Sequence, residues 1–268
     1  MMKKFFARFY IGILLVILYA PLVFIAVFSF TEAKALGNWT GFSTRLYQSL
    51  FTGGMQGGSG LMKAVENTLV IAIVSAAVAT LLGTIAAIGI HNLKGRKKQA
   101  IMFMNNIPMI NPDIIIGVSL FLLFVFLHIS QGMLTVILAH ISFCTPYVVL
   151  SVLPKLSQMN PNIYEAALDL GATPHQALWK VMVPQLRPGM LSGFILAFTM
   201  SLDDFIITHF TTGAGVHTLS TKIYAEVKQG IKPEMYALSA LIFTTVLILL
   251  CLVTRAQNSA EKARGIEE

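Results

Sequence analysis

Long apolar runs dominate this sequence and limit the folds that it can adopt. A helix needs roughly 20 apolar residues to cross the hydrocarbon core of a membrane. Six stretches reach or approach that length, at about residues 11–30, 65–90, 108–127, 133–153, 191–210 and 236–254. The third is the least complete, because Pro108 and Pro112 precede a clean apolar core of only residues 114–127. The pattern predicts an all-α, polytopic membrane protein with six transmembrane helices.

The charge content agrees with this prediction. Only 12% of the residues are charged, whereas a soluble domain carries about 25%, so there is too little polar surface to cover a soluble globule. We therefore expect residues 1–268 to form a single transmembrane domain in contact with membrane lipid. The net charge of +7 comes from short basic clusters that flank apolar runs. That distribution is typical of membrane-protein loops and does not predict a nucleic-acid partner.

Two local features allow other interpretations, a signal peptide and a cysteine-based site, and neither is favoured. The first apolar run follows three basic residues, and the sequence AKA at 33–35 faintly resembles a signal-peptidase site. However, the apolar core of a signal peptide spans about 7–15 residues, so an uncleaved first span is favoured. Cys144 and Cys251 both lie in apolar runs without metal-ligand spacing, so neither a disulfide nor a metal site is predicted.

Basic residues predict the orientation. If the N-terminus is cytoplasmic, 13 of the 19 Lys and Arg residues fall on the cytoplasmic side and six on the outer side. The positive-inside rule then places both termini in the cytoplasm. Two outer loops result, at residues 31–64 and 211–235, and the second is expected to contain a short surface helix. Each loop is either a simple connection or a docking surface for an external partner.

The segment at residues 161–189 interrupts the apolar pattern between the fourth and fifth runs. Asn162 is predicted to cap a first helix in which Glu165 completes an N-x-x-E capping box. Gly171 is predicted to end that helix. A second capped helix follows it, and the two helices together would form a rigid cytoplasmic insert. The alternative is a helix that lies on the membrane interface.

The second helix of the insert has its own start and stop signals. Thr173 and Gln176 form a T-x-x-Q capping box around Pro174 at the first helical position. Pro184 and Pro188 are predicted to end this helix before the fifth span.

Carboxylates inside the apolar runs are the strongest signals for a functional site. Asp203 and Asp204 lie in the fifth run, and Asp113 opens the apolar core of the third. A charged side chain at the bilayer centre costs about 2.5–3.5 kcal/mol, so such residues usually face a cavity or a partner group. Either at least one acid lines a transport path, with Ser201 as a polar neighbour, or the acids bond to neighbouring helices. His128 and His140 are interpreted as structural.

Residues 165–172, EAALDLGA, followed by VMVP at 181–184, resemble the EAA motif of membrane subunits of ATP-binding-cassette (ABC) importers. The motif positions are Glu165, Ala166, Ala167 and Gly171. The resemblance extends to permease subunits of spermidine/putrescine importers, of the PotC type. It is carried by NPDIIIGVSL, LAHISFCTPYVV, FTMSLDDFIITHFTTG and LSTKIYAEVKQGIKPEMYALS, and it covers runs two to six strongly and the first more loosely.

The resemblance implies the six-span, type I importer (MetI-like) fold in a bacterial inner membrane. It also implies a second related permease subunit, two copies of an ATPase and an extracytoplasmic substrate-binding protein. The EAA helix would seat in a groove of the ATPase, and the small side chains of Ala166 and Ala167 would allow close approach. No G-x-x-x-x-G-K-[ST] motif is present, so this chain should bind no cofactor itself, and ATP would be used by the partner ATPase.

With a polyamine as cargo, Asp203, Asp204 and Asp113 are the expected carboxylates of the path. Trp39 is a candidate to stack on a ligand, although an interfacial anchor is commoner. An importer of another cargo, such as a cation chelate, sulfate or a small organic solute, stays open. A secondary transporter is another open alternative, although such a protein would not need the cytoplasmic insert. An intramembrane enzyme is disfavoured because HExxH, GxSxG and a paired His/Asp arrangement in the spans are not seen.

Overall fold

The computed structural model describes residues 2–32, 37–52, 58–160, 162–229, 233, 235–241, 243–245 and 247–248. Apart from one isolated β-bridge, the regular structure of these residues is helical, which confirms the predicted all-α class. The chain divides into two compact units, residues 61–224 and residues 1–60 with 225–268.

The smaller unit contains α1 (Met2–Phe28) and α2 (Arg45–Thr52). The apolar part of α1, Phe9–Phe28, is long enough to span a membrane, in agreement with the first predicted span. After α1, Thr31 and Phe42 form the β-bridge. A short apolar helix covers Met235–Thr245. Most of the sixth predicted span, at 236–254, lies outside the described residues and stays a prediction.

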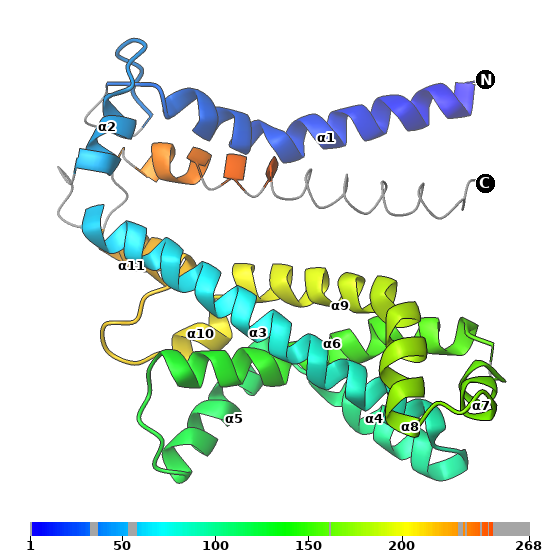
Figure 1. Cartoon of the computed structure of the whole chain (residues 1–268). Helices are drawn as coiled ribbons and strands as arrows, with labels where there is room; N and C mark the ends of the chain where they lie inside the picture. Colours follow the sequence, from blue (N-terminus) through cyan, green and yellow to red (C-terminus); the bar gives the residue numbers. More distant parts are fainter. Residues whose placement is uncertain are drawn as a thin grey trace. The chain divides into compact units, whose positions relative to one another are not determined.

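The larger unit is built around α3 (Gly58–Asn92), α6 (Met133–Gln158) and α9 (Val183–Asp203). Helices α6 and α9 lie along each other (Figure 1). Small residues permit this approach, as is common between membrane helices: a Cβ atom on Gly189 would lie 3.0 Å from Lys155 Cγ, and one on Gly193 would lie 3.1 Å from Val148 Cγ1. Val148 is fully buried at this contact.

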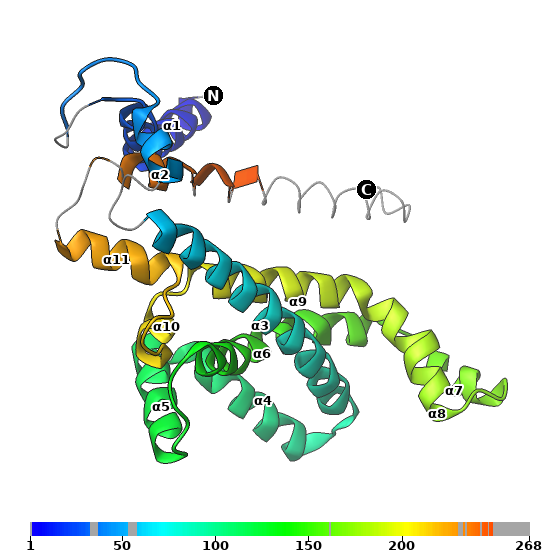
Figure 2. The same ribbon diagram turned by 60° about the vertical axis from the view of Figure 1, so that its left-hand side comes forward.

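The third apolar run is not one straight span. The chain forms α4 (Gly95–Ile110) and α5 (Asp113–Phe126), whose axes differ by 105° (Figure 2). The break falls at Asn111, whose backbone is extended (φ −76°, ψ 141°). Proline disfavours the helical conformation in the residue before it, and Pro112 follows. Residues 108–127 therefore do not form the one straight helix that was predicted, and the basic residues at 96–98 begin α4 instead of forming a loop.

The fifth run is part of a longer helix than predicted. Helix continues from Pro174 to Asp203 through α8 (Pro174–Gln176), the π-helical segment η1 (Ala177–Met182) and α9. Pro184 and Pro188 do not end it. In η1 the Val183 N–H donates to Leu178 O, five residues back, and this wider turn accommodates a proline that cannot make the usual bond. Figures 1 and 2 show the ribbon changing direction between α8 and α9.

Beyond Asp203 the helix breaks, and two short helices follow. They are α10 (Ile206–Thr211) and α11 (Leu219–Gln229), and α11 confirms the surface helix expected within 211–235. Four described helices are long and apolar enough to cross a membrane, and the bent pair α4 and α5 adds a fifth if it is one span. The polytopic class is thus confirmed, with the sixth span outside what is described.

Candidate functional site

The insert begins with α7 (Asn162–Asp169), but its cap differs from the prediction. The Asn162 N–H donates to Asn160 Oδ1 over 3.0 Å, so Asn160 is the capping residue and Asn162 lies inside the helix. Glu165 is then five residues beyond the cap, two too many for a capping box. Its carboxylate is left available for another role.

Gly171 ends α7 as predicted. Its φ of +86° lies in the left-handed region that glycine adopts without strain. The Gly171 N–H donates to Leu168 O (2.9 Å) and the Ala172 N–H to Ala167 O (3.0 Å), which together form a Schellman motif. The next helix starts with the predicted box, because Gln176 N–H donates to Thr173 Oγ1 and Thr173 N–H to Gln176 Oε1. The insert is therefore a fixed two-helix unit.

The motif residues divide between two faces of this unit. Glu165, Ala166 and Gly171 are exposed, whereas Ala167 is only 9% exposed and packs inside the chain. Ala166 alone thus offers the small outward side chain expected of both alanines. Beside it, the side chain of Leu170 is 89% exposed. An apolar side chain so exposed on a rigid insert is suited to contact with a partner.

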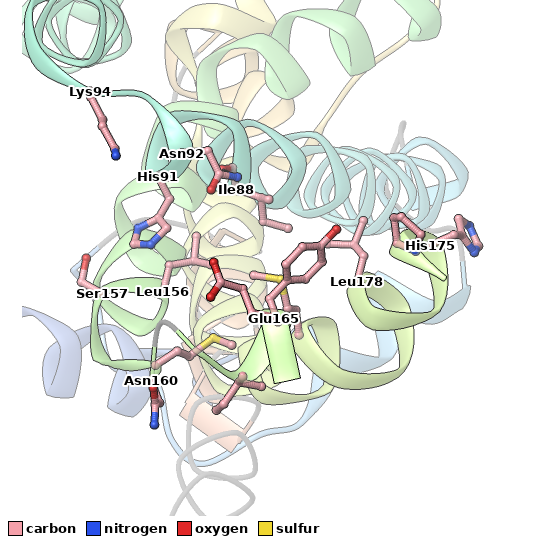
Figure 3. A pocket seen from close by; sticks show the side chains of 15 residues that line it. Ile88, His91, Asn92, Lys94, Leu156, Ser157, Asn160, Glu165, His175 and Leu178 are labelled. Atoms are coloured by element: carbon pink, nitrogen blue, oxygen red, sulfur yellow. Dashed lines mark hydrogen bonds between the residues drawn. The ribbon is translucent and has the colours of Figure 1, made fainter. Parts of the chain in front are cut away.

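A pocket of about 880 Å³ lies between α7 and the ends of α3 and α6. Its walls come from the end of α3, the end of α6, α7 and the α8–η1 turn (Figure 3). Glu165 enters it from α7, and His91 and Asn92 from α3. Of the buried side-chain nitrogen and oxygen atoms in the described residues, only His91 Nδ1 has no hydrogen-bond partner.

The second site lies where α9 breaks. Asp204 caps α10: its Oδ1 accepts from Ile207 N–H (3.2 Å), and its Oδ2 accepts from the N–H and the hydroxyl of Thr208 (2.8 Å each). Asp204 Oδ2 also lies 3.3 Å from His140 Nε2 of α6. The Asp204 side chain is 6% exposed, so its own chain supplies its partners.

His140 joins this cap to α9. Its Nδ1 lies 2.6 Å from Ser201 Oγ, and its Nε2 lies 3.0 Å from Thr208 Oγ1. His140, Ser201 and Thr208 are each buried. The expectation that the spans hold no paired His and Asp is therefore wrong. The partners are 64 residues apart in sequence, so no short motif reveals the pair.

The other predicted path residues, Asp203, Asp113 and Trp39, are exposed. Asp203 and Asp113 are exposed, and neither forms a hydrogen bond or ion pair with a described residue. Trp39, in the smaller unit, is 46% exposed and packs edge-on against Phe28. The structure thus separates Asp204 and Ser201, which are held in a buried network, from Asp203 and Asp113, which present unpaired carboxylates.

Comparison with known proteins identifies the family. The family model described as "Binding-protein-dependent transport system inner membrane component" matches residues 79–260. The chain belongs to this family. It is 39% identical over 92% of its length to the putrescine transport system permease protein PotI of Escherichia coli K12, covering 89% of that protein. It is 34% identical over 92% of its length to the spermidine/putrescine permease protein PotC of the same strain, covering 91% of it.

The fold comparison agrees with the sequence relatives. A chain of a bacterial ABC transporter involved in alginate import superposes with a TM-score of 0.73 over 96% of both chains, at 15% identity. This inner membrane component therefore has the predicted MetI-like ABC permease fold. As a permease subunit it has no catalytic function, and the ATPase of such a transporter is a separate subunit.

Membership in this family also decides how to read the Ser201–His140–Asp204 arrangement. A hydrolase triad needs an accessible nucleophile next to a space for substrate. Here Ser201 is 3% exposed and His140 1% exposed. The network instead fastens α6 to both sides of the break between α9 and α10.

Three features of the site were not predicted. Thr208 carries no sequence signal that separates it from other threonines in the spans. His91 ends an apolar run, and only the fold distinguishes it, by burying its Nδ1 without a hydrogen-bond partner. Phe205, His209 and Tyr224 form a ring cluster, with Phe205 and Tyr224 centroids 4.6 Å apart, and their grouping depends on α11 folding back beside α10.

Proposed function

We propose that this chain is the permease subunit of an ABC importer for the polyamines spermidine or putrescine. The observation that carries the proposal is the similarity, over nine-tenths of the chain, to permeases named for putrescine and for spermidine/putrescine transport. The subunit would form half of the translocation path in a bacterial inner membrane. All residues from 1 to 268 would belong to one permease domain with both termini in the cytoplasm.

The exposed acids support a cationic cargo. A carboxylate facing the apolar part of a membrane is costly unless it meets water or a cation, and Asp203 and Asp113 have no partner among the described residues. An ammonium group passing them regains part of the hydration that it has lost. We assign Asp203 and Asp113 to the path, and Asp204 and Ser201 to its wall through the His140 network. Trp39 is assigned to the outer end as a stacking residue.

The insert supports coupling to ATP hydrolysis. Glu165, Ala166 and Gly171 on its exposed face, next to Leu170, would contact the ATPase, while Ala167 holds α7 to the chain. The complete transporter would contain two ATPase copies, one second related permease and an extracytoplasmic binding protein, surrounded by membrane lipid. The basic residues at 94–98 lie on the same side as the insert in this orientation, in agreement with the positive-inside rule.

Uptake of radiolabelled spermidine and putrescine tests the proposal. The chain is expressed with its ATPase, second permease and binding protein in cells that lack other polyamine import. Uptake is expected only when all four components are present. Uptake without the ATPase would indicate a secondary transporter, and a complete complex that hydrolyses ATP without importing either polyamine would indicate another cargo.

A further inference from the structure

Helix α4 begins with a turn of three cations. Arg96, Lys97 and Lys98 follow Gly95, whose φ of +60° allows the sharp corner between α3 and α4 that is seen in Figure 2. Arg96 and Lys97 are exposed, and Lys98 is half-buried. None of the three side chains forms an ion pair or hydrogen bond with a described residue.

Acids that could balance this turn are scarce. Between Glu66 and Glu165 the sequence contains one acid, Asp113, and Asp113 begins α5, beyond the opposite end of α4. Lys94, the cation before the corner, lies beside His91 at the edge of the pocket (Figure 3). The first turn of α4 thus keeps a positive charge that no acid near it in the sequence neutralises.

The rest of α4 is mostly apolar, and the helix has no buried residue. Residues four and seven apart share one face of a helix, so Lys97 stands at the head of an exposed row with Ile101 and Met104. Arg96 heads the neighbouring row, which contains Phe103. The side chains of Phe103 and Met104 are 68% and 67% exposed.

A third row faces the chain itself. Lys98 shares it with Met102, which packs against the hydrophobic core, and with Asn105, whose Nδ2 lies 3.5 Å from Pro146 O of α6. The rows headed by Arg96 and Lys97 therefore look away from the larger unit.

The exposed rows match the dimensions of one membrane leaflet. From Ile101 to Ile110 the helix rises about 14 Å at about 1.5 Å per residue, and half of a hydrocarbon core is about 15 Å. A phospholipid has the same two parts, a phosphate that Arg and Lys bind through charge-assisted hydrogen bonds and an acyl chain that covers apolar surface. The uncompensated charge favours an anionic headgroup over a zwitterionic one.

We propose that the exposed face of α4, formed by Arg96, Lys97, Ile101, Phe103 and Met104, is a binding site for an anionic phospholipid. The headgroup phosphate lies at Arg96 and Lys97, and an acyl chain lies along Phe103 and Met104. The lipid gives α4 the packing that its own chain does not provide. In the proposed orientation of the importer, the site lies in the cytoplasmic leaflet.

The test uses the complete transporter in phosphatidylcholine nanodiscs. Met104→Cys carries a fluorophore at the site, in a background with Cys251→Ser and without reactive cysteines in the other subunits; Cys144 is buried. Dibrominated phosphatidylglycerol or dibrominated phosphatidylcholine then replaces part of the lipid. Quenching at equal mole fraction gives the relative affinity of the site, which should favour phosphatidylglycerol about twentyfold for two cations.

Variants locate the preference. Arg96→Gln and Lys97→Gln should each lower it about fivefold, and Lys97→Arg, which keeps the charge, should retain it. Lys98→Gln is the matched control, because it removes the same charge from the same turn on the row that faces the chain. It should lower the preference less than twofold.

Equal quenching by the two lipids would overturn the proposal, and so would an equal loss in Lys98→Gln and Lys97→Gln, which would indicate general surface charge. Absence of quenching by either lipid would show that another subunit covers this face. Glycerol phosphate in solution should not displace the lipid at constant ionic strength, and displacement would show a site for free phosphate esters instead. Lipid binding is measured without cargo, so its failure leaves the polyamine importer intact, and failure of polyamine uptake leaves the lipid site intact.

Discussion

Asp203 and Asp204 are adjacent, and the structure predicts opposite consequences of changing them. Replacing Asp204 with Ala removes the acceptor of three hydrogen bonds from α10, at 3.2, 2.8 and 2.8 Å. Each buried donor left without a partner costs about 1–3 kcal/mol. The Thr208 hydroxyl keeps its contact with His140, so the backbone N–H groups of Ile207 and Thr208 are the two donors that lose their acceptor, and we expect a loss of about 2–6 kcal/mol.

Asp204→Asn and Asp203→Asn are the informative pair. Asparagine is as good a cap as aspartate, so Asp204→Asn should lose about half as much stability as the alanine variant, through its weaker bonds to Thr208 and His140. Asp203 is exposed and has no partner among the described residues. Asp203→Asn should therefore change the free energy of unfolding by less than about 0.5 kcal/mol, while polyamine uptake falls about tenfold because an ammonium–carboxylate contact is lost.

Thermal unfolding of the solubilised complex and radiolabelled uptake at equal membrane content measure the two effects. Asp203→Glu, which keeps the charge, serves as the matched control and should retain most of the uptake. An Asp204→Ala complex that unfolds at the wild-type temperature would show that the His140 network does not hold α10. Full uptake by Asp203→Asn would remove that residue from the path.

Three further changes test the insert and the packing of the spans. Gly171→Ala forces a side chain into φ +86° at a cost of about 1–2 kcal/mol, and it should weaken ATP hydrolysis stimulated by the binding protein. Gly171→Asn tolerates this φ and should therefore retain the stimulated hydrolysis. Equal damage by both variants would show that the surface of the insert at Gly171 admits no side chain. Leu170→Asp should abolish co-purification of the ATPase without reducing the amount of permease in the membrane, and retained ATPase would place the contact elsewhere. Gly189→Ala puts a Cβ 3.0 Å from Lys155 Cγ and 3.2 Å from Ser151 O, so the complex should lose about 1–3 kcal/mol of stability. Gly89→Ala, with no atom within 4 Å, should not lower it, and equal melting temperatures would refute the close packing of α6 on α9.

Features fixed by neighbouring residues were predictable from the sequence, and those that depend on distant residues were not. The cap at Thr173 and the stop at Gly171 involve atoms within five residues of each other, and both were predicted. Asn162 and Asn160 show the limit of such reasoning, because two asparagines compete for one cap and only the backbone decides between them. The His140–Asp204 pair joins two helices, so its members could be noticed singly but not paired.

The prolines show the same limit in another form. Pro112 breaks a helix where an extended Asn111 can be tolerated, whereas Pro184 lies within continuous helix because η1 widens just before it. Sequence signals for helix ends therefore predicted neither outcome, because the break before Pro112 falls inside an expected span and helix continues through Pro184, where an end was expected. A membrane favours continued helix, since every broken backbone bond there needs another partner. The break after Asp203 satisfies this requirement through the Asp204 side chain.

The uninterrupted helix from Pro174 to Asp203 connects the two parts of the candidate site. Its α9 portion has 21 residues, which is about 32 Å at about 1.5 Å per residue and close to the roughly 30 Å thickness of a hydrocarbon core. In the proposed importer, this helix joins the insert to Asp203. Gly189 and Gly193 seat α6 against this helix, and His140 of α6 holds the cap beyond its end. In that importer, a displacement of α7 would reach α9 through η1, which contacts both, and α6 through its close packing on α9 at Gly189 and Gly193.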